Sequence, residues 1–240
     1  MEKKGFQFKR FFIEHTHCAM KVGTDSIMLG SWADPNTSEN ILDIGTGSGL
    51  LAIMLAQKAS DNCRIYGIDI DPIAIEQAKL NAKNCPWYQQ LLFEHRPLQA
   101  LSSKCSYDLI ISNPPYFPIN AAANKKQSKN TRVHARQTIT LEHQVLLAQV
   151  IKNLAIDGRF YCVLPFDVAL SFIESAQSMG LFCIKELQVS TTPQKLVTRV
   201  LLAFSLQSNP RVTEKINIYN GLGEYSEEYG LLCKDYYLNF

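Results

Sequence analysis

The stretch ILDIGTGSGLLAIMLAQ, residues 41–57, decides the fold of this chain. The residues ILDI are typical of a buried strand, a turn with three glycines at alternate positions follows, and an apolar helical run comes next. Gly45, Gly47 and Gly49 let the chain turn tightly and bring backbone N–H groups close to a bound molecule, beside the positive end of the helix. A strand, a glycine-rich turn and a helix in this order predict the first βα unit of a parallel sheet.

Strand-like and helix-like runs go on alternating after this unit. The sequence predicts helices at 49–58, 72–83, 141–155 and 167–179 and strands at 41–44, 64–70, 90–95, 107–112 and 158–165. Two more strands, 181–189 and 197–206, follow each other without a helix, which indicates an antiparallel hairpin at the sheet edge. We therefore expect an α/β fold with a seven-stranded, mostly parallel sheet and helices on both faces.

Length and composition predict a single globular domain. The chain has 240 residues, of which 46% are hydrophobic and 19% charged, enough for a large core and too apolar for a disordered chain. We expect a core at 36–206 with extensions at 1–35 and 207–240. Within the extensions the sequence predicts a helix at 25–32, a strand near 216–219 and a helix after Ser226.

Several classes of protein are disfavoured by the composition. The N-terminus has no apolar signal-like region and no long apolar run exists, so we expect a cytoplasmic protein without a membrane partner. The seven cysteines stand singly, which argues against a disulfide framework. The run HTHC at 15–18 has no second pair of ligands to complete a zinc site, so no metal is expected. The net charge of +2 does not by itself indicate a nucleic-acid partner.

An acidic residue ends the strand after the glycine-rich turn. In an open α/β sheet, a carboxylate at the position of Asp69 reaches ligand hydroxyls such as those of a ribose. Asp71 precedes Pro72 and is instead predicted to cap the next helix. Leu50 stands where the dinucleotide fingerprint requires glycine, which disfavours a nicotinamide-dependent dehydrogenase.

These motifs resemble those of the class I S-adenosylmethionine-dependent methyltransferases over residues 41–206. The resemblance implies a Rossmann-like methyltransferase sheet with S-adenosyl-L-methionine as cofactor. It also implies that Asp43 lies near the methionine end of the cofactor, that the glycines pass beneath it, and that Asp69 with the neighbouring Ile70 lies at the ribose. An Asp that often contacts the cofactor's adenine is missing near Pro97, where backbone groups are the expected substitute.

A second motif ends the strand at 107–112. There YDLIIS runs into Asn113-Pro114-Pro115-Tyr116, at the carboxyl edge of the sheet where such folds bind their ligands. Each proline restricts the residue before it to an extended conformation, so the turn is stiff. Because neither proline has an N–H, the turn mainly presents hydrogen-bond acceptors, namely the Asn113 side-chain oxygen and the Pro114 carbonyl.

Acceptors of this kind suit methylation of a conjugated amino group. Such a nitrogen is a poor nucleophile because its lone pair is delocalised, and two acceptors that hold its hydrogens orient the nitrogen and stabilise the charge that grows on it. Tyr116 offers a face on which a flat group can stack, and Pro115 belongs to the same candidate substrate surface. Phe117 is expected either to extend this surface or to be a core residue. The tetrapeptide resembles the signature of methyltransferases that modify adenine N6, guanine N2 or a glutamine side-chain amide.

A basic segment follows this turn. No acidic residue lies between Asp108 and Glu142, whereas five cations do, and a basic loop beside a nucleophile pocket fits a phosphate backbone. An ordinary solvated loop is the simpler explanation of such a composition. The candidate RNA-binding cations are Lys125, Lys126, Lys129, Arg132 and Arg136.

A closer resemblance covers nearly the full chain. The runs FKRFFIEHTHCAMKVGTDSIMLGSWA, NPPY and YSEEYGLL look like those of the bacterial tRNA1(Val) (adenine-37-N6)-methyltransferase family. This resemblance implies a tRNA partner, with a purine in the anticodon loop of a valine isoacceptor as substrate. Lys21, Gly23 and Thr24 would then close over the cofactor, with backbone N–H groups near its carboxylate. Thr24 or Asp25 is also expected to cap the following helix.

Other functions remain open at this point. A release-factor glutamine methyltransferase shares the tetrapeptide but normally carries a separate helical domain, for which residues 1–35 leave no room. Methylation of guanine N2 in ribosomal RNA is the nearer alternative. A non-catalytic RNA-binding module would not need an acceptor-only turn next to a cofactor-like glycine motif.

Overall fold

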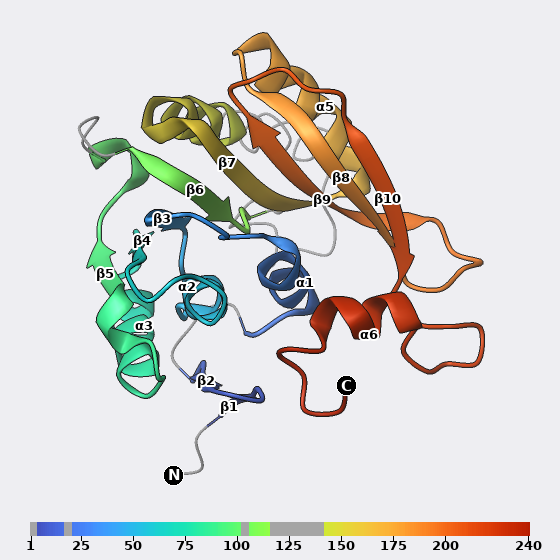
Figure 1. Ribbon diagram of the computed structural model, residues 1–240, viewed down its shortest axis with the longest axis horizontal. Coiled ribbons are helices and arrows are strands. Elements are labelled where there is room, and N and C mark those ends of the chain that lie inside the picture. The colour runs from blue at the N-terminus through green and yellow to red at the C-terminus, as the bar shows by residue number, and fades with distance from the viewer. Residues whose placement is uncertain (1–3, 17–20, 102–105, 116–141) are drawn as a thin grey trace, which may run out of the picture.

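The computed structural model describes residues 4–16, 21–101, 106–115 and 142–240. At its centre is an eight-stranded sheet in the order β10-β8-β9-β7-β6-β3-β4-β5 (Figure 1). Every described neighbour pair is parallel except the two that involve β9. The strands are β3 (Asn40–Ile44), β4 (Arg64–Asp69), β5 (Leu91–His95), β6 (Tyr107–Ser112), β7 (Leu154–Pro165), β8 (Phe182–Ser190), β9 (Val197–Ser205) and β10 (Val212–Asn217).

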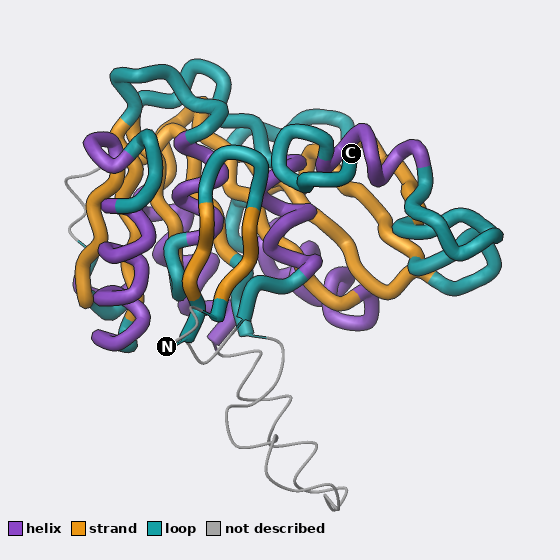
Figure 2. The backbone as a smooth tube through the Cα atoms, turned by 90° about the horizontal axis from the view of Figure 1, so that it is seen from below, coloured by secondary structure: helices purple, strands orange, loops and turns teal. Residues whose placement is uncertain are grey.

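Helices cover both faces of this sheet. The helices are α1 (Thr24–Trp32), α2 (Leu50–Ala56), α3 (Pro72–Lys83), α5 (Phe166–Ser178) and α6 (Glu227–Cys233), a further helix at 142–153, and two 3₁₀ turns, Tyr88–Gln90 and Leu98–Ala100. One apolar cluster contains residues of α1, α2, α3 and α6, and a second contains residues of α5 and the helix at 142–153. Seen from below, the strands lie side by side with the helices against them (Figure 2). The α/β fold and the mostly parallel sheet are therefore confirmed.

Alternation along each strand explains why both faces are apolar. In β3, Ile41 belongs to the first cluster and Leu42 to the second, and in β6 Ile111 and Ile110 divide in the same way. Successive side chains of a strand point to opposite faces, so a continuous apolar run fills two cores at once. The neighbouring apolar residues in the middle of these strands thus follow from burial on both sides.

The expected hairpin exists, but it does not form the edge of the sheet. β8 and β9 pair antiparallel, as expected, whereas β10 pairs with β8 in parallel and occupies that edge. The sheet thus has eight strands rather than seven. The strand expected near 216–219 begins earlier, at Val212, and its first residues, VTEK, are exposed. Because this edge strand is mostly polar at its start, it lacks the alternating apolar side chains from which strands are predicted.

The N-terminal extension packs onto the first apolar cluster. Strands β1 (Gly5–Gln7) and β2 (Phe12–Glu14) form a short antiparallel hairpin, and α1 follows. A Cβ added to Gly30 of α1 would lie 2.7 Å from the Met54 sulfur, so glycine allows α1 to approach α2 closely. The buried Asn81 of α3 donates to the Glu14 carbonyl at 2.9 Å and to the Ser48 carbonyl at 2.8 Å, and it accepts from the Glu14 N–H at 3.0 Å.

The C-terminal extension also contacts this face. The helix α6 begins after Ser226, as predicted, and the Ser226 side chain caps it by accepting from the Tyr229 N–H. The hydroxyl of Tyr236, which is 1% exposed, donates to the Met54 carbonyl at 2.8 Å. The backbone N–H of Lys9 donates to the Tyr236 carbonyl at 2.9 Å, which joins the two ends of the chain. Figure 1 shows the N-terminal hairpin and α6 on the side of the sheet where α1 lies.

The described residues contain neither a membrane-spanning helix nor a metal-binding cluster. None of their helices is both long and apolar enough to cross a bilayer. The same residues contain no group of three or more histidine, cysteine or acidic side chains placed to hold a metal ion.

Asn81 links the N-terminal hairpin to the glycine-rich turn, and this link can be tested. Replacing Asn81 with Ala leaves partners at Glu14 and Ser48 unpaired, so we expect the free energy of unfolding to fall by about 1–3 kcal/mol. Urea denaturation measures this loss. Asn84→Ala, at the residue that follows α3, is the matched control and should cost less, because this side chain is exposed and donates only to the Leu80 carbonyl of α3. Equal effects of the two substitutions would contradict the link.

Candidate active site

The candidate site lies where three neighbouring parallel strands end. The sheet order places β3 between β6 and β4, with Ile44 opposite Ser112 on one side and Ile68 on the other. The glycine-rich turn, Asn113 and Asp69 therefore come to one edge. Strands are ~4.8 Å apart, so the ends of β6 and β4 are separated by roughly 10 Å, a span suited to a nucleoside-sized ligand.

The turn after β3 has the conformation that its glycines predict. Gly45, Gly47 and Gly49 all have positive φ, at 70°, 55° and 81°. The backbone N–H groups of Gly45 and Thr46 both donate to the Ile68 carbonyl, which fastens the turn to the end of β4. A Cβ at Gly45 or Gly47 would meet nothing within 4 Å, so open space lies over this part of the turn.

Asp43 is a buried acid beneath that turn. It is 0% exposed, and its Oδ2 accepts from the Thr46 hydroxyl at 2.6 Å and from the Ala52 N–H at 3.2 Å. Its buried Oδ1 has no hydrogen-bond partner among the described residues. Burial raises the pKa of Asp43 to about 7 despite the two hydrogen bonds, and the nearby charge of Asp69 adds to the rise.

Asp69 is oriented by two backbone donors. Its Oδ2 accepts from the Gly47 N–H at 2.9 Å, and its Oδ1 accepts from the Asp71 N–H at 2.9 Å. A carboxylate oxygen can accept more than one hydrogen bond, so this arrangement fixes the group and leaves it able to bind ligand hydroxyls. Asp71 caps α3 through the Ile73 N–H, as predicted. Ile70 is 68% exposed beside this acid.

These residues fit S-adenosylmethionine. The buried Asp43 oxygen without a described partner suits an N–H donor from a ligand, and the glycines leave room for one to approach the backbone. Asp69 would supply acceptors for a ribose. Near Pro97, the Arg96 N–H already donates to the Asp69 carbonyl, so this N–H is engaged and is not a donor for adenine.

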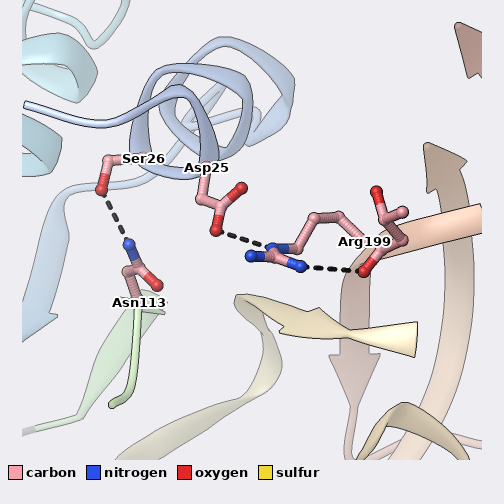
Figure 3. Close-up of polar contacts among 5 residues, drawn as sticks. Asp25, Ser26, Asn113 and Arg199 are labelled. Carbon is pink, nitrogen blue, oxygen red and sulfur yellow. Dashed lines mark hydrogen bonds and ion pairs between the residues drawn. The ribbon is translucent and has the colours of Figure 1, made fainter. Parts of the chain in front are cut away.

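Asn113 directly follows β6, next to the glycine-rich turn. The Ser112 hydroxyl donates to the Ile44 carbonyl at 2.9 Å, which ties the end of β6 to the end of β3. Asn113 is half-buried, Pro114 is buried and Pro115 is exposed. The Asn113 Nδ2 donates to the Ser26 hydroxyl oxygen at 2.8 Å, and Oδ1 lies on the other side of the amide (Figure 3).

The first turn of α1 approaches the same edge. Lys21, Gly23 and Thr24 are exposed here. The capping expected from Thr24 or Asp25 is wrong, because Gly23 is the N-cap residue and provides no side-chain hydrogen bond. The carboxylate of Asp25 instead accepts from Arg199 Nε of β9 at 2.8 Å (Figure 3). Asp25 thus forms an ion pair with a distant strand and does not cap its own helix.

No pattern in the sequence predicts that Ser26, Asp25 and Arg199 lie together near Asn113. Ser26 and Asp25 belong to an ordinary-looking helix start, and nothing near them in sequence shows that the helix reaches Asn113. One signal was available for Arg199, because it is a lone cation at the start of the otherwise apolar run VLLAF, where a buried charge needs a partner. The predictions for Tyr116, Phe117, Lys125, Lys126, Lys129, Arg132 and Arg136 lie outside the described residues.

Comparisons with known proteins agree with this geometry. A family model described as a methyltransferase domain matches residues 35–195. Proteins named tRNA1(Val) (adenine(37)-N6)-methyltransferase are 47% identical in Pseudoalteromonas atlantica, over 100% of both chains, and 41% identical in Pectobacterium carotovorum, over 99% of this chain and 95% of the relative. The chain belongs to this methyltransferase family. Membership of the family implies S-adenosylmethionine as the methyl donor.

Solved structures support the fold of the family at low sequence identity. A predicted O-methyltransferase from Agrobacterium tumefaciens has a TM-score of 0.68 at 14% identity, covering 88% of this chain and 96% of that one. A TehB-like SAM-dependent methyltransferase from Corynebacterium glutamicum has a TM-score of 0.51 at 20% identity, covering 78% and 89%. These similarities confirm the Rossmann-like methyltransferase fold.

The raised pKa of Asp43 makes a prediction about stability and pH. Since the folded state favours the protonated acid, ionisation costs the folded protein stability as pH rises from the ordinary value of 3.8 to about 7. The loss is at most about 1.4 kcal/mol per pH unit and ends above that range. Asp43→Asn cannot ionise, so its advantage in unfolding free energy over the wild type should grow between pH 5 and 7 and level off by pH 8 in ligand-free urea titrations. A constant difference across this range would contradict the assignment.

Proposed function

We propose that this protein transfers a methyl group from S-adenosyl-L-methionine to the exocyclic N6 of adenine 37 in tRNA1(Val). The observation that carries the proposal is the position of Asn113, one strand away from a glycine-rich turn and two from Asp69. A hydrogen-bond acceptor for an amino group thus lies beside the candidate cofactor site, which consists of the glycine-rich turn, Asp43 and Asp69. The names of the relatives supply the adenine and the tRNA, whereas methylation of guanine N2 or a glutamine amide has no such support.

The chain's own residues divide into those that hold the cofactor and those that hold the substrate. Asp43, Asp69 and the three glycines would bind the methionine and ribose parts, with Ile70 against the adenosine and the start of α1, including Lys21, near the carboxylate. When bound, S-adenosylmethionine supplies an electrophilic methyl group. In this proposal the whole chain acts as one methyltransferase domain, with the N-terminal extension over the cofactor site.

Asn113 would orient the attacking nitrogen. Its side-chain oxygen and the Pro114 carbonyl would each accept one hydrogen of the adenine amino group, which directs the developing lone pair and stabilises positive charge on nitrogen. Asn113 does not remove the proton, because an amide has no useful basicity near neutral pH. The proton leaves after transfer, when the nitrogen has become strongly acidic.

The tRNA would be held by residues that follow this turn. In the proposal Tyr116 stacks on the target base, Pro115 and Phe117 extend that surface, and the cations of the basic segment bind anticodon-loop phosphates. A loop nucleotide is easily unstacked, so its base can enter the site at low cost. A tRNA substrate also accords with a cytoplasmic location.

The proposed role of Asp69 predicts a defect in cofactor binding. Asp69→Ala removes a charged acceptor for the ribose hydroxyls, so we expect the Kd for S-adenosylmethionine to rise about 10- to 100-fold. Calorimetric titration measures it. Asp71→Ala, which removes only the cap of α3, is the matched control and should bind nearly as the wild type does. Unchanged affinity in Asp69→Ala would exclude the ribose contact.

The reaction itself is tested with total tRNA from a strain that lacks this activity. The wild-type protein and methyl-labelled S-adenosylmethionine should place label in N6-methyladenosine at position 37 of the valine tRNA, as nucleoside analysis would show. Asn113→Ala should lose about 100-fold or more in kcat, because it removes an acceptor that acts mainly in the transition state, while cofactor affinity stays the same.

Two results would count against the proposal. Label in methylguanosine, or in protein alone, would exclude adenine as the target. Full turnover by Asn113→Ala would exclude the catalytic role of that residue even if adenine is the substrate.

A further inference from the structure

The hydrogen bond between Asn113 and Ser26 joins two segments that lie far apart in the sequence. Ser26 is in the first turn of α1, and Asn113 ends β6. The amide nitrogen donates to the serine oxygen at 2.8 Å, and both residues are partly buried (Figure 3). No motif in the sequence accounts for this contact, and the proposed chemistry does not require the serine to touch the substrate.

The two ends of an asparagine amide are chemically opposite. The oxygen accepts hydrogen bonds, whereas the nitrogen only donates them. A rotation of about 180° about the last side-chain bond exchanges the two, and this torsion is broad and roughly two-fold. A serine hydroxyl can accept from the nitrogen or donate to the oxygen, so the contact fixes the place and plane of the amide, and the side on which the oxygen lies follows from which end faces the serine. In this structure Ser26 binds the nitrogen and the oxygen points away from α1.

The position of Ser26 is itself braced. Asp25, the residue before it, accepts from Arg199 Nε of β9 at 2.8 Å, and only 23% of the Asp25 side chain and 32% of the Arg199 side chain are exposed. Farther along α1, Gly30 packs closely against Met54 of α2. The helix is thus fixed to the core on both sides of the serine, so the hydroxyl is held in place rather than merely close to Asn113.

We infer that Ser26 is a positioning residue that holds the Asn113 amide with its oxygen directed toward the substrate. The inference rests on the proposed function and deepens it. By accepting from Nδ2, the serine holds the rotamer in which Asn113 presents an acceptor to an amino group. The alternative rotamer would present a donor, which repels the hydrogens of that amino group. The N-terminal extension therefore contributes directly to the geometry of transfer.

The main test compares two serines of the same helix. Ser26→Ala removes the acceptor, so we expect kcat for tRNA methylation to fall about tenfold, with the Kd for S-adenosylmethionine and the KM for tRNA within about twofold of the wild type. Ser31→Ala, in the last turn of α1, removes a hydroxyl away from Asn113 and should keep the wild-type kcat. Urea denaturation of both variants shows whether either loses stability.

Two further variants separate orientation from simple structural support. Ser26→Thr keeps a hydroxyl and should restore most of kcat. In an Asn113→Asp background the side chain has two equivalent acceptor oxygens and no amino group, so it needs no such orientation. There Ser26→Ala should change the single-turnover rate by less than about threefold. If the Asn113→Asp enzyme is too slow to measure, the Ala, Thr and Ser31 comparisons decide the matter alone.

The outcomes distinguish this inference from the proposed function. Wild-type protein that labels no tRNA adenine would refute the proposed function. Wild-type labelling together with an unchanged kcat in Ser26→Ala would refute only the positioning role. The same holds if Ser26→Ala weakens cofactor binding and leaves kcat intact, because the serine would then support α1 rather than Asn113. A tenfold loss in Ser31→Ala would likewise show that kcat follows the integrity of the helix.

Discussion

Three parallel strands held in register support the rest of this site. Backbone pairing of β3 with both β4 and β6 makes their carboxyl ends coincide, and the Ser112 hydroxyl on the Ile44 carbonyl secures one of the two junctions. The buried apolar residues that alternate along β3 and β6 set this register, because a slip by one residue would turn each side chain to the wrong core. Precise placement of Asp69 and Asn113 therefore depends on the packing of two apolar clusters.

The N-terminal extension belongs to the site as well as to the fold. Its hairpin is joined through Asn81 to the carbonyl of Ser48 in the glycine-rich turn, and its helix reaches Asn113 through Ser26. The Asp25–Arg199 ion pair connects the same helix to β9. These polar contacts join segments that lie far apart in the chain, so they hold the N-terminal extension in one orientation on the sheet. The position of Asn113 thus depends on the N-terminal extension as well as on β6.

The two acids of the candidate cofactor site, Asp43 and Asp69, would favour a ligand that carries positive charge. Burial makes ionisation of Asp43 costly, and its second oxygen has no partner among the described residues. A cationic donor in this place would favour the charged acid and lower its pKa. Asp69, which is more exposed and held by two backbone N–H groups, keeps its orientation without such help. The two acids thus differ in that one oxygen of Asp43 has no partner among the described residues, whereas both oxygens of Asp69 accept from backbone N–H groups.

The sequence by itself determined the α/β class, the glycine-rich turn, the acid at 69 and the end of β6 at Ser112, because these features depend on residues close together in the chain. Burial on both faces makes such strands apolar throughout, and positive φ requires the glycines. Only the tertiary structure decided that β10 covers the hairpin, that Asp25 pairs with Arg199 rather than capping α1, and that Ser26 meets Asn113. The serine and the asparagine are separated by 87 positions, and no local periodicity encodes which helix end will reach which strand end. The contact arises because α1 packs on the sheet with its first turn beside the end of β6.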